Sequence, residues 1–166
     1  LHLVHPEVRE VVSMVEQMGS AGPRLNRANL QGARLGSRRF ALPVLSDVSY
    51  EKKMIAVGKG HPDVAIFIVN AKAGAKRPAI LHTHGGGFVL GEAETSIRML
   101  QELCKKLDCV AVSVDYRLAP ETNYAGSIED NYAGLKWLHD NAELIGADRN
   151  KIAVMGESAG GGHAAI

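Results

Sequence analysis

Apolar and polar residues alternate along this chain with two different periods, and these periods predict where its strands and helices lie. Short runs rich in β-branched apolar residues predict strands. The segments of this kind are residues 48–57, 64–69, 79–84, 109–114 and 151–155. Apolar residues that recur every three or four positions predict helices at residues 7–18, 94–107 and 127–141, with a further helix beginning near Ser158.

The order of these elements predicts the fold class. We expect residues 48–57 and 64–69 to form a hairpin across residues 58–63. From residue 79 onward strands alternate with helices, an order typical of parallel strands joined by crossover helices. The pattern therefore predicts a three-layer α/β fold with a mostly parallel central sheet.

Residues 19–46 differ from the rest because they contain no Asp or Glu, four glycines and several arginines. The arginines are Arg24, Arg27, Arg34, Arg38 and Arg39. One interpretation is an arm that binds a polyanion. We favour the other, a partly mobile connection with solvated charges, because basic clustering alone is weak evidence.

Composition excludes several classes of protein. Hydrophobic residues make up 46% and charged residues 22% of the 166 residues, which is ordinary for a soluble globular domain, and the net charge of +1 indicates no nucleic-acid partner. No apolar run approaches the roughly 20 residues that span a bilayer, and residues 1–6 do not resemble a signal peptide, so a cytoplasmic location is the default expectation. Cys104 and Cys109 are expected to be small buried apolar residues, with neither a metal nor an organic cofactor implied.

The first candidate for chemistry is Ser158, in the Gly-Glu-Ser-Ala-Gly stretch of residues 156–160. A serine that attacks a carbonyl must protrude from the fold, and a sharp turn between a strand and a helix achieves this. Such a turn needs small residues on both sides, which Gly156 and Gly160 supply. The alternative is an ordinary strand-to-helix turn with no catalytic role.

The second candidate is the His-Gly-Gly-Gly stretch of residues 84–87, which follows the predicted strand at 79–84. Consecutive glycines allow several backbone N–H groups to turn toward one point, where they can stabilise an oxyanion. A phosphate-binding loop is a poorer interpretation, because no Gly-Lys-Ser/Thr follows and the G-x-G-x-x-G spacing is absent.

Three stretches together resemble the hormone-sensitive lipase family of esterases, which has the α/β-hydrolase fold. They are His-Gly-Gly-Gly-Phe at residues 84–88, Asp-Tyr-Arg-Leu-Ala-Pro-Glu at residues 115–121 and Gly-Glu-Ser-Ala-Gly-Gly at residues 156–161. Glu157 is a mild departure, since many relatives have Asp there. The resemblance implies that residues 1–46 are the N-terminal segment of a cap and that residues 47–166 are the N-terminal portion of the catalytic domain.

The resemblance also implies a role for each residue of these stretches. Ser158 would be the nucleophile, and the N–H groups of Gly86, Gly87 and Ala159 would form the oxyanion hole. His84 would brace the glycine loop and would not act as the base. The supporting residues would be Gly85, Gly156, Glu157 and Gly160, and structural roles would fall to Asp115, Arg117 and Glu121.

The general base and its carboxylate partner are not evident in the chain. In this family the order is Ser, then Asp, then His, but only eight residues follow Ser158 and none is Asp. His163 would lie on the same helix as Ser158 and point elsewhere, so we expect it to be a packing or surface histidine with its ring satisfied. His84 is expected to be the only other histidine near Ser158, and we expect the natural protein to continue beyond Ile166 with the missing Asp and His.

The resulting hypothesis is a serine hydrolase of small carboxylic esters with short-to-medium acyl groups, a possible homodimer with no nucleic-acid or membrane partner. An amidase or deacetylase with the same machinery is an alternative, and so is a non-catalytic ligand receptor on the same fold. Whether an Asp and then a His follow Ser158 in the whole protein distinguishes the enzyme from the receptor.

Overall fold

The computed structural model describes residues 2–21 and 24–166, and the side chains of residues 18–21 and 40 lie outside the description. The chain forms two compact units, residues 1–31 and 32–166. The first contains the short 3₁₀ turn η1 (Pro6–Val8) and helix α1 (Arg9–Ala21), where a helix is predicted. The predicted boundary between residues 46 and 47 stays a prediction.

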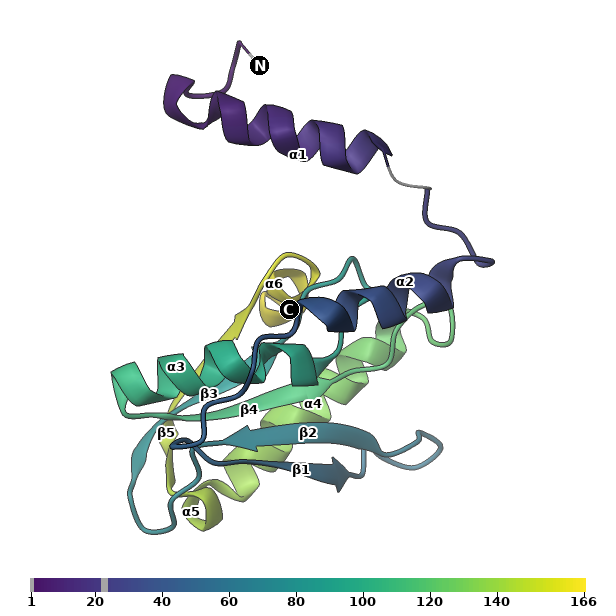
Figure 1. Ribbon diagram of the computed structural model, residues 1–166. Helices are drawn as coiled ribbons and strands as arrows, with labels where there is room; N and C mark the ends of the chain where they lie inside the picture. Colours follow the sequence, from purple (N-terminus) through teal and green to yellow (C-terminus); the bar gives the residue numbers. More distant parts are fainter. Residues whose placement is uncertain (1, 22–23) are drawn as a thin grey trace. The chain divides into compact units, whose positions relative to one another are not determined.

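A five-stranded sheet forms the centre of the second unit (Figure 1). Its strands are β1 (Tyr50–Ile55), β2 (Val64–Val69), β3 (Arg77–Thr83), β4 (Val110–Asp115) and β5 (Ala147–Gly156). They lie in the order β1-β2-β4-β3-β5. The predicted hairpin of β1 and β2 is confirmed, β3 is parallel to both β4 and β5, and β2 alone runs against the other strands, so the sheet is mixed.

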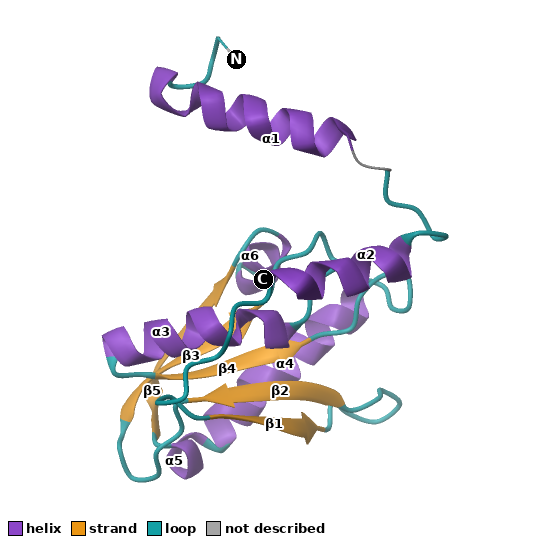
Figure 2. Cartoon of the chain, in the orientation of Figure 1, coloured by secondary structure: helices purple, strands orange, loops and turns teal. Residues whose placement is uncertain are grey.

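Helices cover both faces of this sheet (Figure 2), so the predicted three-layer architecture is confirmed. On one face, α3 (Ile97–Leu107) buries Ile97 and Leu100 against strand residues such as Phe67 and Ile80. On the other face, α4 (Tyr124–Asp140) and α5 (Ala142–Ile145) bury Leu138 and Ile145 against Leu81 and Val112. The strands near the middle of the sheet are buried on both faces, as their apolar runs predict.

The segment with the arginines is more ordered than expected. Helix α2 (Leu30–Ser37) and the 3₁₀ turn η2 (Arg38–Phe40) form where a mobile connection is predicted. Arg34 is not a solvated charge, because its guanidinium donates two hydrogen bonds of 2.8 Å to the carboxylate of Glu121. It also donates to the carbonyl oxygens of Val89 and Ala119, at 2.8 and 2.9 Å. The prediction of solvated charges is therefore wrong for this residue, whose partners are distant in sequence.

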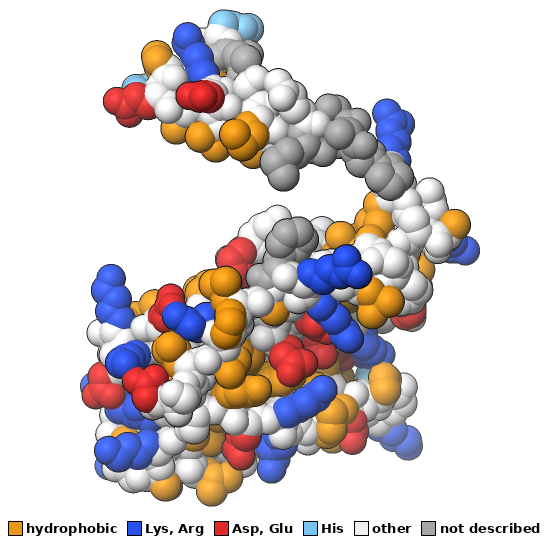
Figure 3. All heavy atoms as spheres, viewed as in Figure 1, with side chains coloured by type: hydrophobic (Ala, Val, Ile, Leu, Met, Phe, Trp, Pro, Cys, Tyr) orange, Lys and Arg blue, Asp and Glu red, His pale blue; other side chains and the backbone are white. Residues whose placement is uncertain are grey.

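The surface carries charges of both signs. Over the face seen in Figure 3, basic and acidic side chains of residues 32–166 lie interspersed rather than gathered in one basic patch. Within the described part of the chain, no helix combines the length and the apolar character that crossing a membrane requires.

Strand β5 lies at the edge of the sheet and leaves part of its apolar surface open. Val154 is 41% exposed. With Leu135 of α4 and His163 it lines a groove of about 310 Å³. Ser158 lies two residues after the end of this strand, so the edge of the sheet lies next to the candidate site.

Candidate active site

Ser158 lies at a sharp turn between β5 and α6. Strand β5 ends at Gly156 and α6 (Ala159–Ala164) begins one residue after Ser158. The backbone of Ser158 has φ 52° and ψ −115°, a left-handed conformation that residues with a Cβ rarely adopt. The side chain is exposed, so the turn presents the hydroxyl outside the packed core.

Gly156 and Gly160 make this turn possible because no side chain would fit at either position. A Cβ on Gly156 would lie 2.4 Å from the carbonyl of Gly160, and a Cβ on Gly160 would lie 2.0 Å from the carbonyl oxygen of Thr83. The Thr83 hydroxyl also donates a 2.7 Å hydrogen bond to the Gly160 carbonyl. Strand β3 and the start of α6 are therefore in direct backbone contact.

The glycine loop after β3 lies against the same turn. A Cβ on Gly85 would come within 2.9 Å of the Glu157 carbonyl oxygen and 3.7 Å of the Ser158 Cβ. Gly86 and Gly87 have φ values of 132° and 61°, which glycine adopts without strain. Within the described ranges, the N–H groups of Gly86, Gly87 and Ala159 donate no hydrogen bond. These groups are free to bind an acceptor.

His84 packs inside the glycine loop. Its Nδ1 donates to the Gly85 carbonyl oxygen at 2.8 Å, and its ring stacks on Tyr116 with centroids 4.2 Å apart. The Tyr116 hydroxyl donates to the His84 carbonyl oxygen at 2.7 Å. Burial lowers the pKa of the His84 imidazole below its usual value, so the ring is a poor candidate for a charged group at neutral pH.

The sequence pattern does not identify a second histidine next to the turn. His82 of β3 is wholly buried, and its Nε2 lies 2.9 Å from Oε1 of Glu157, the residue that precedes Ser158. Its Nδ1 lies 2.8 Å from the Ser113 hydroxyl on β4. The expectation that His84 is the only other histidine near Ser158 is therefore wrong. The alternation of β3 places residues 80 and 82 on one face, but only the strand order brings Glu157 to that face.

His163 is a packing residue, as predicted, but its ring is not satisfied. It is buried in an aromatic cluster, with its ring centroid 4.7 Å from Tyr116, 5.0 Å from Phe88 and 5.6 Å from Tyr124. Neither ring nitrogen has a hydrogen-bond partner among the described residues. Burial lowers the pKa of this imidazole, which favours its neutral form.

The charged residues of the 115–121 stretch bind other parts of the chain. Asp115 accepts the Ala93 N–H at 2.8 Å. Arg117 donates to the fully buried carboxylate of Asp130 through its backbone N–H and its guanidinium, at 2.7 to 3.1 Å. Arg34 lowers the pKa of Glu121 to about 2 through their hydrogen bonds. These contacts stabilise the loops that follow β4.

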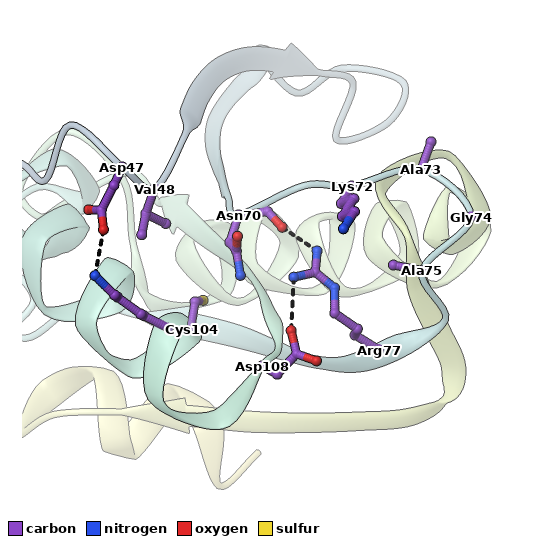
Figure 4. Close-up of a pocket in the computed structure, with 11 residues that line it drawn as sticks. Asp47, Val48, Asn70, Lys72, Ala73, Gly74, Ala75, Arg77, Cys104 and Asp108 are labelled. Atoms are coloured by element: carbon purple, nitrogen blue, oxygen red, sulfur yellow. Dashed lines mark hydrogen bonds and ion pairs between the residues drawn. The ribbon is translucent and has the colours of Figure 1, made fainter.

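Two cavities differ in their relation to the turn. A small, mostly apolar one of about 130 Å³ lies beside Phe88 at the end of the glycine loop and is also lined by Tyr124. The other, of about 650 Å³, lies at the opposite end of β3 (Figure 4), where the guanidinium of Arg77 points between Asn70 and Asp108. No residue of the three sequence motifs lines that second cavity.

No metal site accompanies these groups. Within residues 2–21 and 24–166, no cluster of three or more His, Cys, Asp or Glu side chains could hold an ion. Cys104 and Cys109 are both buried as free thiols, and burial raises the pKa of each. The chemistry available at the turn is that of an exposed hydroxyl beside several free backbone donors.

Comparison with known proteins gives the family. A family model described as the alpha/beta hydrolase fold matches residues 80–166, more than half of the chain, and the chain therefore belongs to this family. Its relatives include several proteins named esterases or carboxylesterases, as the three motifs predict, and its predicted relationship to the hormone-sensitive lipase group is confirmed.

Three relatives illustrate the similarity. Esterase LipI of Mycobacterium tuberculosis is 45% identical over 92 residues, which are 55% of this chain and 29% of the relative. The structure of EstE1, a thermostable carboxylesterase from a metagenomic library, matches with a TM-score of 0.74 and 39% identity, covering 85% of this chain and 49% of that one. A hyperthermophilic esterase from Pyrobaculum calidifontis matches with a TM-score of 0.74 and 34% identity, covering 98% of this chain and 52% of that one. The chain thus spans about half the length of these solved esterases.

Proposed function

We propose that the whole protein is a carboxylic ester hydrolase in which Ser158 is the nucleophile. The observation that carries this proposal is the turn itself. Ser158 is exposed at a positive φ between a strand and a helix, beside a glycine loop whose N–H groups are free within the described chain. The esterase relatives support the same reaction class.

The mechanism follows from these groups. Ser158 Oγ attacks the ester carbonyl carbon, and the carbonyl electron pair moves to the oxygen. The N–H groups of Gly86, Gly87 and Ala159 would donate to this oxyanion, which stabilises the tetrahedral intermediate more than the planar ester. Collapse of the intermediate breaks the bond to the alcohol oxygen, which takes up the proton removed from Ser158. Water then hydrolyses the acyl-serine, which releases the acid and restores the Ser158 hydroxyl.

A general base must remove the proton of Ser158, and we propose that it comes from other residues of the whole protein. Among the described residues, no histidine is hydrogen-bonded to the Ser158 hydroxyl. His84 donates its Nδ1 proton to Gly85, and His163 is enclosed by aromatic rings. Neither is placed to act as this base.

The class of substrate and the role of residues 1–46 also belong to this proposal. Small esters with short-to-medium acyl groups are the expected substrates, and the apolar cavity beside Phe88 offers one surface for such a group. Residues 1–46 are proposed to contribute the N-terminal part of a cap. Both assignments rest on the resemblance to the esterase family.

The test is Ser158→Ala in the whole protein, measured with p-nitrophenyl butyrate. Loss of the nucleophile should reduce kcat by about 10⁴-fold or more, because the hydroxyl forms the covalent intermediate. Labelling by a fluorophosphonate should disappear in the same variant. Turnover by Ser158→Ala within tenfold of the unmodified protein would overturn the nucleophile assignment. If the unmodified protein has the Asp and His that follow Ser158 but does not hydrolyse esters, the amidase alternative is favoured.

A further inference from the structure

His82 links the centre of the sheet to the residue that precedes Ser158. It lies on β3, directly opposite Ser113 of the parallel neighbour β4 and opposite Met155 of β5. Its imidazole is wholly buried, yet both ring nitrogens have partners on different strands or turns. A buried polar ring at a strand position where apolar residues are usual indicates a specific role for these two hydrogen bonds.

The carboxylate partner fixes the direction of one of the two hydrogen bonds, and the neutral ring then fixes the other. The ionised carboxylate of Glu157 can only accept, so His82 Nε2–H donates to it, at 2.9 Å to Oε1 and 3.1 Å to Oε2. In the neutral ring that carries its proton at Nε2, Nδ1 accepts from the Ser113 hydroxyl at 2.8 Å. Three groups from β4, β3 and the Ser158 turn therefore form one chain of hydrogen bonds, in which each partner fixes the orientation of the next.

Glu157 is held at its backbone as well as at its side chain. Its carbonyl oxygen accepts the Gly160 N–H at 2.9 Å. The backbone of Gly85 lies so close to this oxygen that a Cβ there would approach it to 2.9 Å. The peptide that leads into Ser158 is thus held by its side chain, by its carbonyl and by the glycine loop.

This fixation matters because Ser158 has an unfavourable backbone conformation. A positive φ at a residue with a Cβ persists only where the surroundings enforce it. Loss of one restraint on Glu157 would allow the turn to relax, and displacements of about 1 Å at a nucleophile reduce rates by roughly 10²-fold. The Glu157 side chain is 44% exposed, so its own contribution to folding stability is expected to be small.

We propose that His82 is a positioning residue for Ser158 and acts through Glu157. The inference rests on the proposed function of Ser158 as nucleophile. His82 touches neither the substrate nor the reacting atoms. It holds the Glu157 carboxylate, and thereby keeps the Ser158 hydroxyl and the Ala159 N–H in their positions relative to the glycine loop.

The test compares variants of His82 and Glu157 in the whole protein, with kcat and KM for p-nitrophenyl butyrate as the readout. His82→Phe removes both hydrogen bonds and should lower kcat by about 10-fold to 10²-fold while KM changes less than about threefold. His82→Gln keeps an acceptor and a donor on one planar group and should recover most of the lost kcat. His139→Phe, at an exposed position on α4, is the matched control and should leave kcat unchanged.

A double-mutant cycle separates positioning from a general structural role. If His82 acts through Glu157, then Glu157→Ala should lower kcat by a similar factor and His82→Phe/Glu157→Ala should lower it no further. Multiplicative effects of the two substitutions, or a kcat of His82→Phe equal to that of the unmodified protein, would overturn the proposal. Should His82→Phe fail to fold, the partly exposed Glu157→Ala carries the test by itself, and a kcat equal to that of the unmodified protein would then overturn the proposal.

The Ser158→Ala result tests the proposed function separately from the positioning role of His82. If the unmodified protein hydrolyses the ester and Ser158→Ala does not, the proposed function holds, and unchanged rates in the His82 and Glu157 variants then overturn the positioning role alone. If Ser158→Ala retains full turnover, both proposals are wrong. A fluorophosphonate labelling rate that falls in His82→Phe in parallel with kcat would support the positioning role independently of ester turnover.

Discussion

At the scale of single residues, the Ser158 turn depends on space that only glycine leaves free. Gly160 does not need glycine for its backbone angles, since its φ is not positive. It needs glycine because the carbonyl oxygens of Thr83 and His84 lie 2.0 and 2.6 Å from where a Cβ would be. Backbone atoms cannot move aside as a flexible side chain can, so the requirement is steric.

Gly160→Ala is therefore expected to destabilise the fold by about 1–3 kcal/mol, the usual range for overpacking a close contact. The free energy of unfolding from urea titration measures this. Gly162→Ala is the control on the same helix, where a Cβ would meet only the Phe88 ring at 3.5 Å. It should leave stability unchanged or raise it by up to about 1 kcal/mol through helix propensity. Equal effects of the two substitutions would contradict the steric explanation.

At the scale of elements, periodicity predicts the interior of the sheet closely. Strand β2 has the predicted bounds, and β4 is shifted by one residue. Helix α5 is only four residues long, too short for a periodic pattern, and the polar first half of β5 does not have the composition of a strand. For these reasons the sequence pattern predicts neither α5 nor the first half of β5.

The candidate site likewise contains residues that the sequence predicts and contacts that it does not. Residues in contiguous motifs, such as Ser158 and the glycine loop, could be predicted because their local spacing reflects one turn or one loop. The contact of His82 with Glu157 could not be predicted, because it depends on the order β4-β3-β5 and on the parallel register of β3 with both neighbours. The same holds for Arg34, whose partner Glu121 is 87 residues away in sequence.

The Arg34–Glu121 pair predicts a pH dependence of stability. The folded pKa of Glu121 is about 2, below its ordinary value of 4.5, so the pair stabilises the fold above about pH 4.5 and this contribution is lost as pH falls through about 2. Glu121→Gln should therefore lower Tm at pH 7, and by progressively less as pH falls from about 4.5 toward 2. Thermal unfolding across this range measures the difference.

Glu129→Gln is the control for this series, since Glu129 has no ion pair with any described residue. Its Tm should follow that of the unmodified protein at every pH. A Tm difference for Glu121→Gln that stays constant from pH 7 to pH 2 would indicate that the stabilisation does not come from the charge on this carboxylate.

At the scale of the whole molecule, the described residues supply the proposed nucleophile Ser158 and free backbone donors, and no histidine among them is hydrogen-bonded to the Ser158 hydroxyl. A polypeptide of residues 1–166 is therefore expected to turn over p-nitrophenyl butyrate at least about 10³-fold more slowly than the whole protein, because an unactivated serine is a weak nucleophile. Steady-state and burst measurements on both forms test this. A rapid burst from residues 1–166 would show that a base lies within them. A folded state of that polypeptide, checked by circular dichroism, is the necessary control.

The left-handed backbone of Ser158 also places stability and activity in opposition. Ser158→Gly should relieve the strain of the Cβ, a gain of about 1 kcal/mol in the free energy of unfolding after the greater chain entropy of glycine is subtracted. Ser158→Ala keeps the Cβ and should show no such gain, although both variants lose the hydroxyl. A stabilising effect restricted to glycine would mean that selection for hydrolysis maintains a serine at a position where folding alone favours glycine.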